Sequence, residues 1–207
     1  LDGRYADMVS PLSGYFSEFA FLRDRVRIEL DFLSALSKTG LIRPLTDSES
    51  AQLKSNKSNF STADAELIRA HERVTRHDVK AIEYFLQEKL QDTSLKDLLP
   101  WIHFGLTSED VNNIAQAIAL RDSRDAILLP ALDFLINCLH EFSKQTRALP
   151  MLARTHGQAA VPTTLGKEFA VYIARLKKTR DEIDAHRFEA KRSGAVEYGP
   201  GMLRTRI

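Results

Sequence analysis

The sequence has one cysteine, Cys138, and one tryptophan among its 207 residues. A lone cysteine excludes an internal disulfide and fits a reducing compartment. The 29 basic and 28 acidic residues leave a formal net charge of +1, so the strongly basic face typical of nucleic-acid binding is missing. No apolar run approaches membrane-spanning length, and the first residues lack the apolar core of a signal peptide. We expect a soluble, cytoplasmic protein that binds neither nucleic acid nor a membrane.

Several common site motifs are absent as well. There is no phosphate-binding loop, no glycine-rich dinucleotide fingerprint and no nucleophile elbow. His71 and His77 are six residues apart, whereas the two histidines of a helical zinc site are four apart. The sequence therefore predicts neither a metal ion nor a cofactor.

What the chain does have is helical periodicity. Apolar residues recur at steps of three or four from residue 15 to about 37, and Gly40 then provides a stop signal. Thr46 and Glu49 form a capping-box pattern that opens a short helix. The polar stretch 55–62 is expected to connect it to a helix around Ile68, and residues 78–90 give another. The region 1–106 is expected to be a domain of short helices.

Two much longer helical patterns follow. The first starts after the possible caps Thr107 and Ser108 and extends to about residue 142, with an expected kink at Pro130. The second extends from about residue 164 to 191. Each would be roughly 40–55 Å long, and two such helices cannot cover their own apolar faces. We predict an all-α chain in which residues 107–207 begin a central bundle, completed by further sequence or by other subunits.

Polar clusters lie where these helices begin or end. Arginine can hold phosphate or carboxylate, hydroxyl groups at a helix start help to bind anions, and histidine transfers protons near neutral pH. These residue types together predict a small polyanionic substrate and proton-transfer chemistry. The candidate residues are Arg4, Tyr5, Arg76, His77, Asp78, Thr107, Ser108, Thr155, His156 and Gln158.

Each cluster also has a simpler explanation. Thr107 and Ser108 can be a helix cap only, and His77 can be a surface residue of a first helical turn. Arg4 and Tyr5 lie near a terminus, where mobility is common. His156 favours a function more strongly, because a connection between two packed helices seldom combines histidine with hydroxyl and amide groups.

Four segments carry a resemblance to a known family: DGRY, ERVTRHDVKAIEYFL, HFGLTSEDVNN and RTHGQAAVPTTLGKE. Together, and in this order, they resemble the adenylosuccinate lyases of the fumarase/aspartase superfamily. The resemblance covers residues 1 to about 196 and implies a C–N lyase that releases fumarate from adenylosuccinate and from succinyl-aminoimidazole-carboxamide ribotide. It also implies a homotetramer whose active sites are shared between subunits.

The resemblance implies roles for the candidate residues. His156 matches the proton donor, and His77, with Arg76 and Asp78, matches a segment that assists the leaving group. Thr107 and Ser108 match contacts to the succinyl carboxylates. Arg4 and Tyr5 match nucleotide-binding residues, and the neighbours of His156, Thr155 and Gln158, are added as substrate contacts.

Two departures from the family pattern limit this interpretation. The family's general base is a serine on a glycine- and serine-rich loop beyond position 207, and the match ends after about Val196, where EYGPGMLRTRI follows; Arg192 also stands where an apolar residue is expected. We therefore expect the 207 residues alone to have little or no activity. The alternatives are a lyase acting on argininosuccinate or aspartate, and a non-catalytic helical interaction module.

Overall fold

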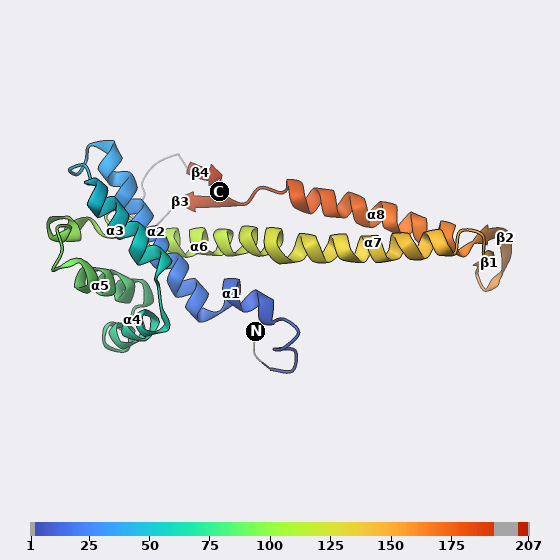
Figure 1. The fold of residues 1–207 in the computed structure, drawn as a ribbon, viewed down its shortest axis with the longest axis horizontal. Helices are drawn as coiled ribbons and strands as arrows, with labels where there is room; N and C mark the ends of the chain where they lie inside the picture. The colour runs from blue at the N-terminus through green and yellow to red at the C-terminus, as the bar shows by residue number, and fades with distance from the viewer. Residues whose placement is uncertain (1–2, 193–202, 207) are drawn as a thin grey trace. The chain divides into compact units, whose positions relative to one another are not determined.

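The computed structural model in Figure 1 describes the backbone of residues 3–192 and 203–206. Most of this backbone is helical, as predicted. The helices are α1 (Ser13–Phe16), α2 (Glu18–Thr39), α3 (Asp47–Ser58), α4 (Thr62–Thr75), α5 (Asp78–Leu90), α6 (Ser108–Ser123), α7 (Leu129–Gln145) and α8 (Leu165–Ala185). Short 3₁₀ helices span Ser10–Leu12 and Lys96–Trp101, and a π-helical turn spans Arg124–Leu128. The strands are β1 (Pro150–Thr155), β2 (Gln158–Thr164), β3 (Glu189–Arg192) and β4 (Leu203–Arg206).

The chain forms two compact units. The first comprises residues 1–120 and 188–207, and the second comprises residues 121–187. The division falls inside α6, so that helix starts in one unit and ends in the other. A domain boundary between residues 106 and 107 remains our proposal for the complete fold.

The first unit is built around α2, whose apolar residues are buried against α3, α4, α5 and the segment that follows α5. Leu30 and Leu33 of α2 are at most 1% exposed, as are Ile68 of α4 and Ile82 of α5. Burying each such side chain contributes about 1.5–3 kcal/mol. A second cluster joins Ile28 of α2 to the start of α6. Helix α2 therefore packs against the elements that carry His77 and Ser108.

The expected helix ends in this unit are confirmed where local signals were present. The Thr46 hydroxyl accepts a hydrogen bond from the Glu49 N–H, and the Glu49 carboxylate accepts one from the Thr46 N–H. Gly40 ends α2 with φ +80°, a conformation that glycine adopts without strain. The polar connection expected over residues 55–62 is shorter than predicted, because α3 continues to Ser58.

The second unit is a pair of antiparallel helices, α7 and α8, which lie side by side and are joined by the β1–β2 hairpin (Figure 1). The helices come into backbone contact at Gly166. Its N–H donates to the Thr146 carbonyl at 3.1 Å, and its carbonyl accepts from the Ser143 hydroxyl at 2.6 Å. A Cβ atom at Gly166 would lie 2.3 Å from the Ser143 carbonyl oxygen. Only glycine allows this close approach.

Three expectations about the long helices need correction. The connection between them, for which the sequence predicted no strands, is a β-hairpin. The second long helix ends at Ala185, six residues before the predicted end. The disturbance expected at Pro130 takes the form of a π-helical turn just before it, which accommodates the missing N–H of proline. The divergence after Val196 concerns residues that lie mostly outside the described part of the chain.

The helix from Ser108 to Gln145 is, by length and composition, long and apolar enough to cross a membrane. This contradicts the expectation that no apolar run approaches membrane-spanning length. One such helix is weak evidence for a membrane span, because a core helix of a soluble assembly has the same properties. Only 17% of its most apolar window is buried. In the second unit several large apolar side chains are exposed, both on this helix and on α8: Leu128, Phe134, Leu135, Phe142, Val171 and Tyr172.

Candidate functional site

His77 lies in the tight turn between α4 and α5. Arg76 ends α4 in the left-handed conformation, with φ +54°, and His77 then takes an extended conformation as the N-cap of α5. Its Nδ1 atom accepts a hydrogen bond from the Lys80 N–H at 3.1 Å. A neutral imidazole whose Nδ1 is an acceptor carries its proton on Nε2. The cap therefore orients His77 so that Nε2 is the available donor.

Nε2 of His77 faces the start of α6, where Ser108 Oγ lies 3.5 Å away. The neighbouring Thr107 hydroxyl and N–H both donate to the Asp110 carboxylate, at 2.9 and 2.8 Å. The Thr107 hydroxyl is thereby engaged within its own helix start, whereas the Ser108 hydroxyl points toward the imidazole. The fold thus brings together His77 and Ser108, two candidates that are 31 residues apart.

Asp78, the residue that follows His77, is anchored to α2. Its carboxylate accepts a hydrogen bond from Arg25 Nη2 of α2 at 2.7 Å. Partial burial of Asp78 opposes its ionisation, but the charge of Arg25 and hydrogen bonds from the Val79 N–H and Arg25 outweigh this effect, so the pKa of Asp78 lies below its ordinary value. Asp78 is therefore an anion at neutral pH and is held by α2.

The segment before Ser108 is held by the same helix. His103 has φ +61°, a conformation that costs a non-glycine residue about 1–3 kcal/mol. Its N–H donates to Glu29 Oε2 at 3.1 Å, and its Nδ1 lies 2.6 Å from Glu29 Oε1. The hydrogen bond to Glu29 raises the pKa of His103, although burial opposes this. The buried carboxylate stabilises the strained turn.

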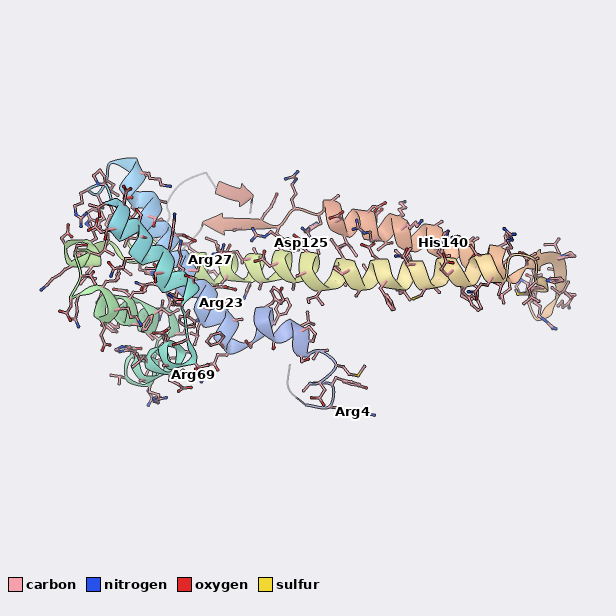
Figure 2. All side chains as sticks on the ribbon, in the orientation of Figure 1. Arg4, Arg23, Arg27, Arg69, Asp125 and His140 are labelled. Carbon is pink, nitrogen blue, oxygen red and sulfur yellow. The ribbon has the colours of Figure 1, made fainter. Side chains whose placement is uncertain are left out.

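Arg76 belongs to a cationic groove on the surface of α4. The groove has a volume of about 550 Å³ and is open to solvent. Arg69 within it forms ion pairs with Glu18 and Glu66, both at 2.5 Å, and its position is shown in Figure 2. Because these two carboxylates already occupy Arg69, Arg73 and Arg76 are the arginines of the groove that suit an anionic group. The lining residues are Arg69, Glu72, Arg73 and Arg76.

Arg4 and Tyr5 lie in the N-terminal segment before α1, where Figure 2 labels Arg4. The Arg4 guanidinium lies 5.5 Å from the centre of the Tyr5 ring, and Tyr5 is 58% exposed. Among the described residues, no hydrogen bond or ion pair connects either of them to His77 or Ser108. The structure places them in the first unit without bringing them to these two side chains.

His156 lies at the tip of the β1–β2 hairpin in the second unit. Thr155 and Gln158 pair across the strands, so His156 and Gly157 form a two-residue turn. Their φ angles are +51° and +76°, and two positive φ angles in succession are the signature of a type I′ turn. All four residues at the tip are exposed. The hairpin presents the imidazole to the surroundings, with Thr155 and Gln158 beside it.

The sequence-based reasoning missed Arg25 and Glu29. Both are charged residues next to the buried positions Val26 and Leu30 of an apolar helix, and this pattern could have indicated them. Their partners could not be predicted, because Asp78 and His103 are 53 and 74 residues away in the sequence. Across the part of the chain that the structure describes, no group of three or more histidine, cysteine, aspartate or glutamate side chains is placed to hold a metal ion.

Comparison with known proteins places the chain among lyases. A family profile described as "Lyase" matches residues 3–202. The adenylosuccinate lyase of Haemophilus influenzae is 42% identical over 200 residues, which are 95% of this chain and 44% of the relative. The enzymes of that name from Dictyostelium discoideum and Escherichia coli K12 are both 40% identical, over 89% and 95% of this chain. The chain spans less than half the length of these relatives.

Solved structures show the same fold at lower identity. The β-carboxy-cis,cis-muconate cycloisomerase of Acinetobacter calcoaceticus matches 90% of this chain and 43% of its own, with a TM-score of 0.72 and 22% identity. A fumarate lyase from Mesorhizobium matches 89% of this chain and 41% of its own, with a TM-score of 0.70 and 22% identity. The expected all-α fold of the fumarase/aspartase type is confirmed.

Proposed function

The chain belongs to the lyase family, and on that premise we propose that it is the N-terminal part of an adenylosuccinate lyase of purine biosynthesis. The observation that carries the proposal is the identity of about 40%, over 95% of the chain, to relatives that bear this name. The proposed reactions release fumarate from adenylosuccinate, giving AMP, and from succinyl-aminoimidazole-carboxamide ribotide.

The reaction is an elimination that needs two proton transfers. A base removes a proton from the carbon next to one succinyl carboxylate, and the electron pair forms the C=C bond of fumarate as the C–N bond breaks. The departing nitrogen receives a proton from an acid, so atoms and charge balance without a cofactor. Fixed donors stabilise the charge that develops on the carboxylate. The resemblance to the family assigns the base to a serine outside these 207 residues.

The chain's own residues suit the other half of this reaction. His156 is proposed as the proton donor to the departing nitrogen, with Thr155 and Gln158 as neighbouring substrate contacts. His77 is proposed to assist through Nε2, which its cap leaves as the available donor. A positioned acid of this kind contributes about 10²–10⁴-fold to a rate.

The remaining candidates are proposed to hold the anionic substrate. Thr107 and Ser108, at the start of α6, suit the succinyl carboxylates, since a helix start favours negative charge. Arg76 and Asp78 are proposed contacts of the same segment as His77, with the cationic groove beside Arg76 in support. Arg4 and Tyr5 are proposed to contact the nucleotide.

We propose that four copies of the complete protein assemble and that each active site draws residues from more than one subunit. The exposed apolar side chains of α7 and α8 support this proposal, because patches of this kind on a protein surface mark interaction sites. Neither nucleic acid nor a membrane is a proposed partner. A cytoplasmic location is proposed from the single cysteine, which suits a reducing compartment.

The test is a chimera that joins residues 1–190 to the remaining C-terminal part of the Haemophilus influenzae relative. We expect it to convert adenylosuccinate to AMP and fumarate, whereas the 207 residues alone show no turnover. The same chimera is assayed with argininosuccinate and with aspartate. An assembled chimera that cleaves either of these and leaves adenylosuccinate intact would identify a different lyase. An assembled chimera inactive on all three would favour the non-catalytic helical module.

A further inference from the structure

Two of the charged side chains that helix α2 buries, Arg25 and Glu29, pair with groups on other elements. Arg25 is 5% exposed and Glu29 is 1% exposed, and they are four residues apart, which places them on one face of the helix. A buried charge is unfavourable unless another group compensates it. Each of the two is compensated by a group on a different element, and both of these elements carry a candidate site residue.

Glu29 holds the segment that leads to Ser108. One of its carboxylate oxygens accepts a hydrogen bond from the His103 N–H, and the other is hydrogen-bonded to His103 Nδ1. The His103 carbonyl in turn accepts a hydrogen bond from the Leu106 N–H at 3.2 Å. This hydrogen-bonded turn ends directly before Thr107. A positive φ angle is unfavourable for His103, so this turn depends on the hydrogen bonds to Glu29 that hold it. Glu29 therefore anchors the turn that leads into α6.

Arg25 holds the segment that carries His77. Its Nη2 donates to Asp78 Oδ2 at 2.7 Å, and its guanidinium lies 3.8 Å from the centre of the Phe21 ring. The Nε atom of Arg25 is buried and lacks a hydrogen-bond partner among the described residues. Asp78 follows the N-cap directly, so this ion pair fixes the position of the imidazole.

We propose that Arg25 and Glu29 are positioning residues that set the separation between His77 Nε2 and Ser108 Oγ. The starts of α5 and α6 lie far apart in the sequence, and both contact α2. One helical turn of α2 separates the two anchors, a spacing of about 6 Å along the axis. The proposal rests on the proposed function, in which His77 and Ser108 contact the substrate, and it adds that a buried pair outside the site determines their geometry.

The packing of α2 supports this role. Val26 and Leu30, next to the two charged residues, are at most 1% exposed, and Ile28 packs against Val111 and Ala115 at the start of α6. A helix packed on several sides keeps its side chains at fixed positions. Arg25 and Glu29 are therefore held in fixed positions from which they can anchor the starts of α5 and α6.

The first test uses nuclear magnetic resonance on the 207-residue chain, which needs no substrate. We compare Glu29→Gln, which keeps the size of the side chain, with Asp24→Asn as a matched control. Asp24 is a buried carboxylate on the same helix, but it pairs with Arg23 of α2 itself. In Glu29→Gln we expect shifts of the Thr107 and Ser108 amide signals and of the His77 ring signals. In Asp24→Asn these signals stay at their original positions.

The second test measures turnover in the active chimera. Displacement of a site residue by about 1 Å can cost a hundredfold in rate. We expect kcat for adenylosuccinate to fall about tenfold to a hundredfold in Glu29→Gln and to stay within twofold in Asp24→Asn. If Glu29→Gln does not fold, Arg25→Met tests the other anchor with the same ring signals of His77.

The outcomes separate the two proposals. A folded Glu29→Gln chain whose His77 and Ser108 signals match those of Asp24→Asn overturns the positioning role, and so does unchanged kcat in a chimera that turns over adenylosuccinate. Shifted signals together with turnover of another lyase substrate overturn the proposed function and support the positioning role.

Discussion

Arg43 holds Glu49 through two parallel hydrogen bonds, each 2.9 Å long, one to each carboxylate oxygen. The carboxylate is 3% exposed and also caps α3, while the same guanidinium binds Asp97 and the Ser94 carbonyl. One side chain therefore ties the start of α3 to the segment after α5. This ion pair makes the stability of the first unit depend on pH.

The free energy of unfolding is expected to fall at low pH because of Glu49. Hydrogen bonding to Arg43 lowers the pKa of Glu49 from 4.5 to about 2, although burial opposes this. A lowered pKa in the folded state means that the stabilisation is complete above pH 4.5 and is lost as the pH falls toward 2. Urea unfolding between pH 2 and 7 measures the effect.

The matched variants for that experiment are Glu49→Gln and Asp47→Asn, both in the first turn of α3. Glutamine keeps the capping hydrogen bond but loses the ion pair, and we expect a loss of about 1–3 kcal/mol at pH 7 and a flatter pH profile. Asp47 is exposed and serves as the control. A Glu49→Gln profile as steep as that of the original chain would contradict the assignment.

Gly166→Ala is expected to destabilise the second unit by about 3 kcal/mol. The new Cβ would lie 2.3 Å from the Ser143 carbonyl oxygen and 2.7 Å from Arg147 Cα, and backbone atoms cannot move aside as a flexible side chain can. The control is Gly14→Ala in α1, where nothing lies within 4 Å. Thermal unfolding checks both variants, and equal midpoints would show that α7 and α8 do not approach this closely.

His77→Asn separates the structural role of this residue from its proposed chemistry. Asparagine is among the best N-cap residues, so α5 should keep its start and the free energy of unfolding should change by less than about 1 kcal/mol. The proton-bearing Nε2 is lost, and kcat of the chimera should fall about 10²–10⁴-fold. Steady-state kinetics with adenylosuccinate decides, and activity within threefold of the original would exclude His77 from the reaction.

His156→Asn applies the same logic at the hairpin. Asn-Gly is a favoured type I′ turn, and asparagine tolerates a positive φ angle, so β1 and β2 should pair as before. Loss of the proposed proton donor should lower kcat about 10²–10⁴-fold. His140→Asn, on the exposed part of α7, is the control. Equal loss in both variants would mean that the effect does not come from proton donation.

Local signals in the sequence predicted much of the first unit. The bounds of α5 follow from its periodic apolar residues Val79, Ile82 and Phe85, and the start of α3 follows from the capping box. The His77 segment and the Ser108 segment were both candidates. Their proximity was not predictable from spacing, because it depends on Arg25 and Glu29, whose partners are distant in the sequence.

The second unit shows why other features were missed. The residues around 185–190 are ordinary helix formers, but α8 stops because Arg124 donates hydrogen bonds to the carbonyls of Ile183 and His186, a contact between distant residues. The hairpin was missed because its turn uses His156 where asparagine or aspartate is the usual signal.

The irregular register of the hairpin limits how its length can vary. Leu152 pairs with Pro162 and Arg154 pairs with Ala159, so two residues of β2 stand opposite Ala153 alone. The extra residue changes the side of the sheet on which later side chains emerge. Removing or adding a single residue here would turn the imidazole at the tip to the opposite side relative to α8. Insertions and deletions in homologous genes should therefore avoid this segment and accumulate in turns such as the one between α3 and α4.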